Sequence, residues 1–211
     1  MFNIAYKFTF IFKNRSNWLL LYNIEKYING AILQVGRVEK ERKAHFKKFI
    51  GLPIAHFRRL DNIFLDAHFY FICIDQIDKN LKRLIGQLDN KNLEIIYQEF
   101  QTDFDSEIRN DLEHIDARAV GKTKFEKDVD ENTKRSWMVD FVNFQGDKLS
   151  FGGRKYAINK DSIKKLKKIY QKLIRTIRAD YALKDKNYVE MEKALRMTRY
   201  FKKQFPIRTV L

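Results

Sequence analysis

Three side chains near the middle of the chain have the types and spacing to act on a phosphodiester. The segment Arg109-Asn110-Asp111-Leu112-Glu113-His114 places an arginine and a histidine five positions apart, with an amide directly after the arginine. An imidazole transfers protons near neutral pH, and a guanidinium offers phosphate oxygens a fixed fork of donors. Such a set fits metal-free cleavage of RNA. The competing interpretation is an ordinary solvated helix face, because short motifs are weak evidence by themselves.

A helical projection of this segment predicts that the motif faces outward. At 100° per residue, four apolar residues share one narrow face. They are Ile108, Leu112, Ile115 and Ala119. Arg109, Asn110 and His114 therefore project away from that face. Residues 102–105 offer N-caps for this helix, and Gly121 is a plausible C-terminal stop.

The elements before the motif are predicted to be one strand followed by helices. Aromatic and β-branched residues alternate with period two over residues 2–12, which indicates a strand. A helical pattern over 18–48, with a candidate break at Gly36, ends at Gly51-Leu52-Pro53. The strongest pattern, at spacings of three and four, predicts a central helix that ends at Asp89-Asn90. Its stripe consists of Leu60, Ile63, Ala67, Tyr70, Ile74, Ile77, Leu81, Leu84 and Leu88. A shorter helix is expected over about 93–100.

The elements after the motif are predicted to be a charged loop, a β-hairpin and two helices. Residues 122–135 are poor in apolar side chains, which favours a loop. The hairpin would pair 137–144 with 149–158 across a Gly146-Asp147 turn, and the N-terminal strand is a candidate third partner. Gly152-Gly153 indicates a bend or bulge in the second strand. Asn159 or Asp161 would cap a helix over about 162–183, and a last helix would cover about 187–203.

The charge of the chain indicates a polyanionic partner. The 211 residues, enough for one domain or one domain with an appendage, carry a net charge of +15. Residues 1–120 hold 18 basic and 16 acidic side chains, whereas 121–211 hold 24 and 11. Candidate phosphate contacts on the 162–183 helix are Lys164, Lys165, Lys168, Lys172 and Arg175. A solvated charged face is an equally good interpretation of this helix. A membrane-surface helix is a weaker one, since its apolar face is expected to be used in folding.

Several classes of protein do not fit the sequence. The single cysteine, Cys73, lies in an apolar run, so neither a disulfide framework nor a cysteine metal site is expected. His45, His56 and His68 lack the spacing of a metal site, so no metal or cofactor is expected. No stretch reaches the roughly 18 uncharged apolar residues of a membrane span. The N-terminus also lacks the pattern of a signal peptide, which favours the cytoplasm.

The Arg109-Asn110-x-x-x-His114 pattern resembles the Arg-x(4–6)-His motif of the HEPN superfamily, in which a polar residue commonly follows the arginine. The resemblance covers roughly residues 15–120 and implies a mainly α fold, a helical bundle. We expect such a bundle over 1–121, with the N-terminal strand. We expect residues 122–211, the basic β-hairpin and two helices, to form an extension packed on the same domain.

The resemblance also implies an activity. Many HEPN proteins are metal-independent endoribonucleases that act as toxins or anti-phage effectors. The 2′-OH attacks the adjacent phosphate, with His114 as general acid or base, Arg109 as phosphate clamp and Asn110 as an orienting group. Glu113 could hold Arg109 in position, and Arg118 could add to the phosphate site.

The single histidine implies a homodimer. One histidine cannot readily serve both ends of an in-line displacement, and HEPN enzymes pair two motifs across a dimer cleft. An antitoxin or another regulatory partner is compatible with this class. The alternative is a non-catalytic HEPN-like dimer that binds nucleic acid or a protein partner.

Overall fold

The computed structural model describes residues 1–9, 12, 14–47, 53–104, 144–145, 148–151, 154–190 and 192–194. Over these residues the protein is mainly helical with one small antiparallel sheet, as the sequence predicted. Four long helices dominate this part of the chain. They are α1 (Arg15–Lys47), α2 (Pro53–Leu88), α3 (Lys91–Asp103) and α7 (Lys160–Asp180).

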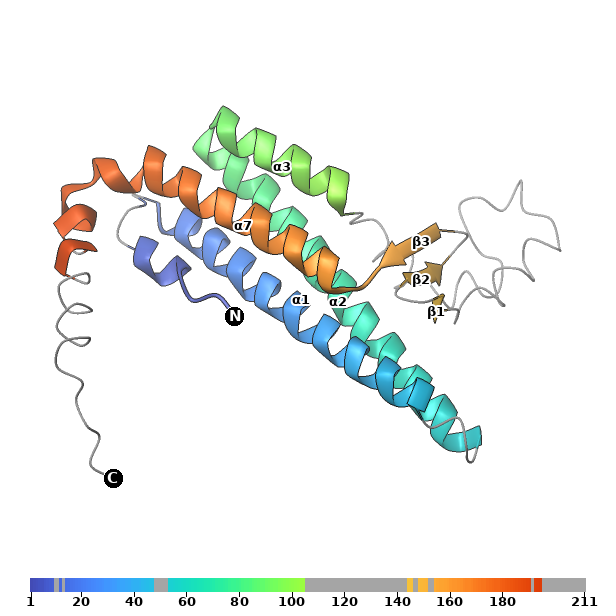
Figure 1. Ribbon diagram of the computed structural model, residues 1–211. Helices are drawn as coiled ribbons and strands as arrows, with labels where there is room; N and C mark the ends of the chain where they lie inside the picture. The colour runs from blue at the N-terminus through green and yellow to red at the C-terminus, as the bar shows by residue number, and fades with distance from the viewer. Residues whose placement is uncertain are drawn as a thin grey trace, which may run out of the picture.

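The four helices form an up-down-up-down bundle (Figure 1). Helix α1 packs against α2 and α7, and α3 packs against α2 and α7. Contacts at both ends show that α3 and α7 are antiparallel. Asn90, which precedes α3, donates to Asp180 at the end of α7, and Asp103 at the end of α3 pairs with Lys165 near the start of α7. Helix α7 therefore completes the bundle itself rather than lying outside it.

The long α1–α2 pair contains a close approach of the two helices. A Cβ placed on Gly30 would lie 2.8 Å from the Cys73 sulfur, which is nearer than real contacts allow. Gly30 is thus needed where the two helices come closest. Helix α1 continues through Gly36 without a break, so the predicted interruption there was wrong. Nothing lies within 4 Å of a Cβ at Gly36, so that glycine has no packing role.

The central stripe of α2 and the apolar face of α7 are buried as predicted. On α2 the buried members include Ile63, Ala67, Tyr70, Ile74, Ile77, Leu81 and Leu84. On α7 they are Ile163, Leu166, Ile169, Leu173 and Ile177. Spacings of three and four place such residues on one side of a helix, where they face the bundle core. The basic residues of α7 are left on its outer side.

Side-chain caps define where α3 and α7 begin. The Asn90 side chain accepts hydrogen bonds from the backbone N–H groups of Asn92 and Leu93. The Asn159 side chain accepts from the N–H of Ser162, which confirms Asn159 rather than Asp161 as the cap of α7. Asp89, between α2 and α3, has a φ of 45°, the left-handed conformation that Asp tolerates better than most residues. Asp89 and the Asn90 cap together form the turn that reverses the chain between α2 and α3.

The N-terminal segment is not a strand, and this prediction was wrong. Ala5–Phe8 form a 3-10 helix, η1, in which Ala5 and Phe8 are buried and Tyr6 is 50% exposed. Side chains of α1 bind the backbone groups that a sheet would have used. Asn29 binds both the N–H and the carbonyl of Phe2, at 2.7 and 2.9 Å. The segment is therefore held against the bundle and does not join the sheet.

The sheet has three strands, β1 (Phe144–Gln145), β2 (Lys148–Phe151) and β3 (Arg154–Ala157), in the order β1-β2-β3. The predicted antiparallel pairing of the strands on either side of positions 146–147 is confirmed, because Phe144 pairs with Leu149 across β1 and β2. The single predicted strand over 149–158 is instead two antiparallel strands, with Phe151 paired to Arg154. The glycines between them separate two strands, where the sequence had indicated a bend within one.

Candidate nucleic-acid interface

The predicted catalytic residues lie outside the described part of the chain. This applies to Arg109, Asn110, Glu113, His114 and Arg118. Of the expected N-caps for the motif helix, Thr102 and Asp103 belong to the last turn of α3. The structure thus describes the chain up to Phe104, five residues before Arg109.

Phe104 directly follows the last residue of α3. Its backbone is extended, and its N–H donates to the Phe100 carbonyl at 2.9 Å, which closes α3. Its ring stacks on that of Phe100, with centroids 5.2 Å apart, and the residue is 8% exposed. Phe104 is therefore anchored in the core, directly before the motif segment, the name used here for residues 105–121.

Two of the predicted phosphate contacts on α7 instead join α7 to α3. Lys165 Nζ lies 2.6 Å from an Asp103 carboxylate oxygen, and Lys172 is hydrogen-bonded to Glu99. The Lys165 side chain is 55% exposed and the Lys172 side chain 40% exposed, so both remain in contact with solvent. Contacts between α3 and α7 therefore account for the positions of both lysines. Exposed ion pairs of this kind each add little to the free energy of unfolding.

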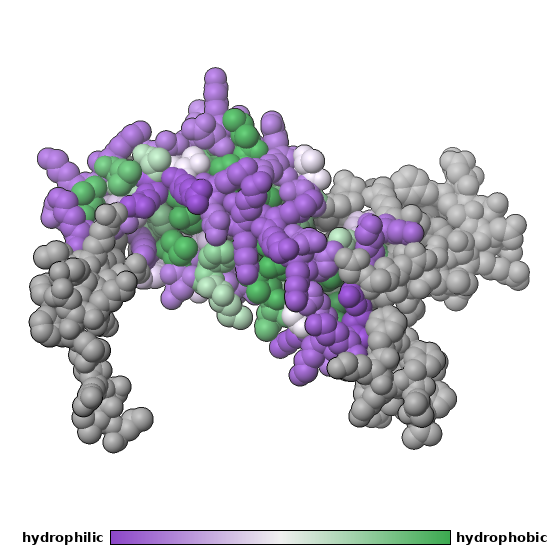
Figure 2. Space-filling view, in the orientation of Figure 1, coloured by the Kyte–Doolittle hydropathy of each residue, from purple (hydrophilic) through white to green (hydrophobic). Residues whose placement is uncertain are grey.

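Most of the other basic side chains of α7 face solvent. Lys164 pairs with Asp161 at 2.8 Å within the first turns of the helix, and the hydrogen bond and charge of Asp161 raise the pKa of Lys164. Lys167, Lys168 and Arg175 are exposed and form no ion pair with another described residue. Hydrophilic side chains predominate over the face that α7 presents in Figure 2. These three cations, here called the α7 basic patch, are available to an anionic partner.

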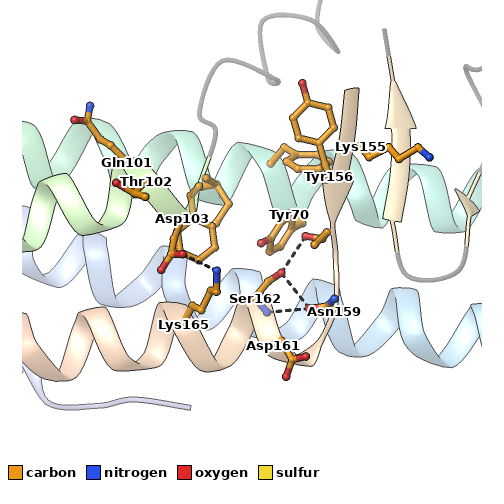
Figure 3. Close-up of a pocket in the computed structure, with 14 residues that line it drawn as sticks. Tyr70, Gln101, Thr102, Asp103, Lys155, Tyr156, Asn159, Asp161, Ser162 and Lys165 are labelled. Atoms are coloured by element: carbon orange, nitrogen blue, oxygen red, sulfur yellow. Dashed lines mark hydrogen bonds and ion pairs between the residues drawn. The ribbon is translucent and has the colours of Figure 1, made fainter. Parts of the chain in front are cut away.

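A cavity of about 770 Å³ lies where α3 ends and α7 begins (Figure 3). Side chains from α2, α3, β3 and α7 surround it. We call it the end cavity. Its lining is Tyr70, Phe71, Ile74, Gln101, Thr102, Asp103, Phe104, Lys155, Tyr156, Ala157, Asn159, Asp161, Ser162 and Lys165. Because Phe104 belongs to its wall, the cavity adjoins the start of the motif segment.

Hydrogen-bonding groups from α2 and α7 meet on one side of the end cavity. The Ser162 hydroxyl contacts the Ala157 carbonyl at 3.1 Å and the Asn159 side-chain oxygen at 3.2 Å. Burial raises the pKa of Tyr70, although its hydrogen bond with Ser162 acts in the opposite direction. The Tyr70 hydroxyl is therefore neutral over the ordinary pH range, like the groups beside it.

Aromatic rings form another side of the end cavity, and its charges are balanced. Phe71 meets Tyr156 edge to face, with centroids 5.6 Å apart and an interplanar angle of 73°. The lining holds two lysines and two aspartates. Of these, Lys165 is paired with Asp103 inside the lining. The cavity thus offers aromatic surface and neutral hydrogen-bonding groups rather than a net charge.

The sequence pattern did not identify this cavity. Tyr70 was predicted only as part of the central stripe, and Tyr156 only as a strand residue. Ser162 was assigned only to the start of a helix. Four separate elements bring these residues together, and no local spacing signals such a convergence.

Within the described ranges, no group of three or more His, Cys, Asp or Glu residues is arranged to hold a metal ion. None of the helices in that same part of the chain is long and apolar enough to span a membrane. Comparison with family models, curated proteins and solved structures finds no match for this chain.

Proposed function

We propose that this protein is a metal-independent endoribonuclease that cleaves RNA by 2′-OH transesterification at a composite homodimer site. The observation that carries the proposal is the Arg109-Asn110-x-x-x-His114 pattern immediately downstream of α3 in a helical bundle. The mainly helical fold is of the class that the HEPN resemblance implies, although α7, the fourth helix of the described bundle, lies outside residues 15–120. A toxin or anti-phage effector is the biological role that the same resemblance favours.

The proposed chemistry assigns one task to each residue of the motif. His114 takes the proton from the 2′-OH or gives one to the departing 5′-oxygen. Arg109 binds the non-bridging oxygens, where negative charge grows in the transition state. Asn110 orients the phosphate, the ribose or His114. The second proton transfer falls to His114 of the other subunit, because the two transfers occur at opposite ends of the reacting phosphate.

Covalent geometry limits how far Arg109 can lie from the end cavity. An extended chain spans at most about 3.6 Å per residue, so the Cα of Arg109 lies within about 18 Å of the Cα of Phe104. The same end of the bundle carries the sheet and the start of α7. We therefore assign the bound phosphate to this end of the bundle.

The α7 basic patch supports RNA as the substrate. Lys167 and Lys168 lie about two turns before Arg175, so the patch extends along the helix axis. Binding of RNA phosphates to exposed cations is favourable because the phosphates release their bound counterions. Such a surface binds the RNA backbone without reading its sequence.

The decisive experiment compares the wild type with Arg109→Ala and His114→Ala on RNA in the presence of EDTA. We expect wild-type cleavage that leaves 2′,3′-cyclic phosphate ends, and a loss of at least 100-fold in both variants. Arg83→Ala, which removes an exposed arginine of α2, is the matched control and should cleave like the wild type. Equal cleavage by all four proteins would overturn the assignment of the site.

The oligomeric state tests the composite site separately. We expect the active species to be a dimer by light scattering coupled to gel filtration. A strictly monomeric protein with full activity would contradict a site built from two subunits and leave the motif assignment intact.

The second candidate is a non-catalytic dimer that binds nucleic acid or a protein partner. The α7 basic patch favours the nucleic-acid version, because it needs no catalytic residue. RNA binding that is equal in wild type, Arg109→Ala and His114→Ala, with no cleavage by any of them, would support this candidate over the nuclease.

A further inference from the structure

We propose that the end cavity binds a nucleobase and holds it beside the motif segment. In the context of the proposed nuclease, this base belongs to the single-stranded RNA substrate, a point that rests on the proposed function. The base would enter between the rings of β3 and α2 on one side and Phe104 on the other.

The size of the end cavity fits this occupant. A volume of about 770 Å³ lies within the range of small-molecule sites, which is roughly 300–1,000 Å³. It is large enough for a base and its ribose. The cavity opens to solvent, so a base could enter it from the surface.

The lining has the two kinds of group by which proteins bind unpaired bases. Aromatic rings stack on the faces of bases, and neutral polar groups bond to their edges. Tyr156, Phe71 and Phe104 supply aromatic surface. Ser162 and Asn159, which Figure 3 shows hydrogen-bonded to each other, supply a hydroxyl and an amide in the same lining, and Gln101 lies at its edge with its amide nitrogen donating to Tyr97.

The charge of the lining favours a base over a phosphate. The two lysines of the wall are matched by two aspartates, and the Lys165–Asp103 pair is already formed. A bare phosphate dianion would meet the Asp103 and Asp161 carboxylates without a net positive charge to hold it. The backbone phosphates are better served by the α7 basic patch outside the cavity. Base and backbone would thus bind to different parts of one surface.

Photocrosslinking tests the proposal without altering the cavity. RNA containing 4-thiouridine is irradiated with the His114→Ala protein, which keeps the RNA intact, and the modified peptides are identified by mass spectrometry. We expect crosslinks at Tyr156, Phe104 or Phe71. Crosslinks confined to the α7 basic patch and other outer surfaces would overturn the proposal.

A filling substitution gives a second, independent measurement. Ala157 lines the cavity from β3 and is exposed, so Ala157→Trp should occupy the space without removing a buried contact. Ala179→Trp, at an exposed position near the far end of α7, is the matched control. We expect Ala157→Trp to weaken the binding of labelled single-stranded RNA about tenfold or more, and Ala179→Trp to bind like wild type. Equal thermal melting of both variants shows that folding is not the cause.

The two proposals can fail separately. Cleavage that leaves cyclic ends, together with wild-type RNA affinity in Ala157→Trp and no crosslink in the cavity, overturns the base site and leaves the nuclease standing. Cavity crosslinks without any cleavage support the base site and remove the nuclease. Titration with free nucleoside monophosphates distinguishes the source of the base. If they bind wild type but not Ala157→Trp while RNA does not crosslink, the base comes from a free nucleotide.

Discussion

Tyr170 of α7 donates a hydrogen bond from its hydroxyl to the buried side chain of Glu25 on α1. The same carboxyl oxygen accepts the backbone N–H groups of Ile4 and Ala5, at 2.7 and 3.0 Å. Glu25 is only 4% exposed, so a buried acidic group joins two helices and the N-terminal segment. Three donors compensate for much of the cost of removing that oxygen from water.

Tyr170→Phe should destabilise the bundle without changing its shape. The substitution removes one donor from a buried acidic group, which costs about 1.5–3 kcal/mol of the free energy of unfolding. Urea denaturation of wild type and variant measures the difference. Tyr6→Phe, at a half-exposed tyrosine of η1, is the control and should change the free energy by less than about 0.5 kcal/mol. Equal stability of the three proteins would mean that the Glu25 contact contributes nothing.

Gly30→Ala should destabilise the protein, whereas Gly36→Ala should stabilise it. The added methyl at Gly30 meets the Cys73 sulfur at 2.8 Å, and overpacking of this kind costs about 1–3 kcal/mol. The added methyl at Gly36 meets nothing within 4 Å, so only the better helix propensity of alanine remains, worth about 0.5–1 kcal/mol. Thermal unfolding should show a lower melting temperature for Gly30→Ala and a higher one for Gly36→Ala. Cys73→Ala should recover part of the loss in the Gly30→Ala background, and a lack of any recovery would place the clash elsewhere.

The Cys73 thiol should be nearly inert in the folded protein. Burial raises its pKa from 9.0 to about 11, so the thiolate fraction at pH 8 falls about 100-fold. Because the folded pKa is the higher one, the associated stability is complete below pH 9 and is lost as the pH rises toward 11. Alkylation by iodoacetamide at pH 8 should be at least 100-fold slower in the native protein than in urea. Ala179→Cys in a Cys73→Ala background supplies an exposed thiol, and similar native rates for the two cysteines would disprove burial.

Neutralising the α7 basic patch should weaken RNA binding and its dependence on salt. The triple variant Lys167→Gln, Lys168→Gln, Arg175→Gln removes three candidate phosphate contacts. For single-stranded RNA, each lost contact lowers the slope of log K against log salt by about 0.7, so a change of about 2 is expected. The control Lys82→Gln, Arg83→Gln, Lys91→Gln removes the same charge from exposed positions of α2 and α3. Fluorescence anisotropy over a salt series gives the slope of log K against log salt for each triple variant. Identical slopes for the patch variant and the control would exclude the patch as the RNA surface.

The parts of the fold that the sequence predicted are those with local, periodic causes. The α2 stripe and the α7 apolar face follow from spacings of three and four, and Asn159 caps α7 through a contact within three residues. The prediction of an N-terminal strand failed because side chains that are distant in the sequence determine the conformation of this segment. Glu25 and Asn29, more than twenty residues away, bind its backbone, and no pattern within residues 1–9 indicates this.

The candidate site was predicted in its chemistry but not in its surroundings. The motif is a short sequence pattern, so Arg109, Asn110 and His114 could be identified from the sequence alone. These three residues lie outside the described part of the chain. Lys165 and Lys172 carried the same sequence signal as Lys168, yet their α3 partners gave them a different environment. Charge patterns within one helix do not show which side chains a neighbouring helix will neutralise.

The antiparallel contact between α3 and α7 brings together the two ends of the long segment that joins them. Positions 105–158 lie between Phe104 and Asn159. Both of these residues line the end cavity, so the segment begins and ends at the same place. Closing a long loop costs little more than closing a short one, since each doubling of length adds only about 0.6 kcal/mol. Closure of the bundle therefore constrains the length of this segment only weakly. The core constrains its described end, because Leu149, Tyr156 and Ile158 are buried there.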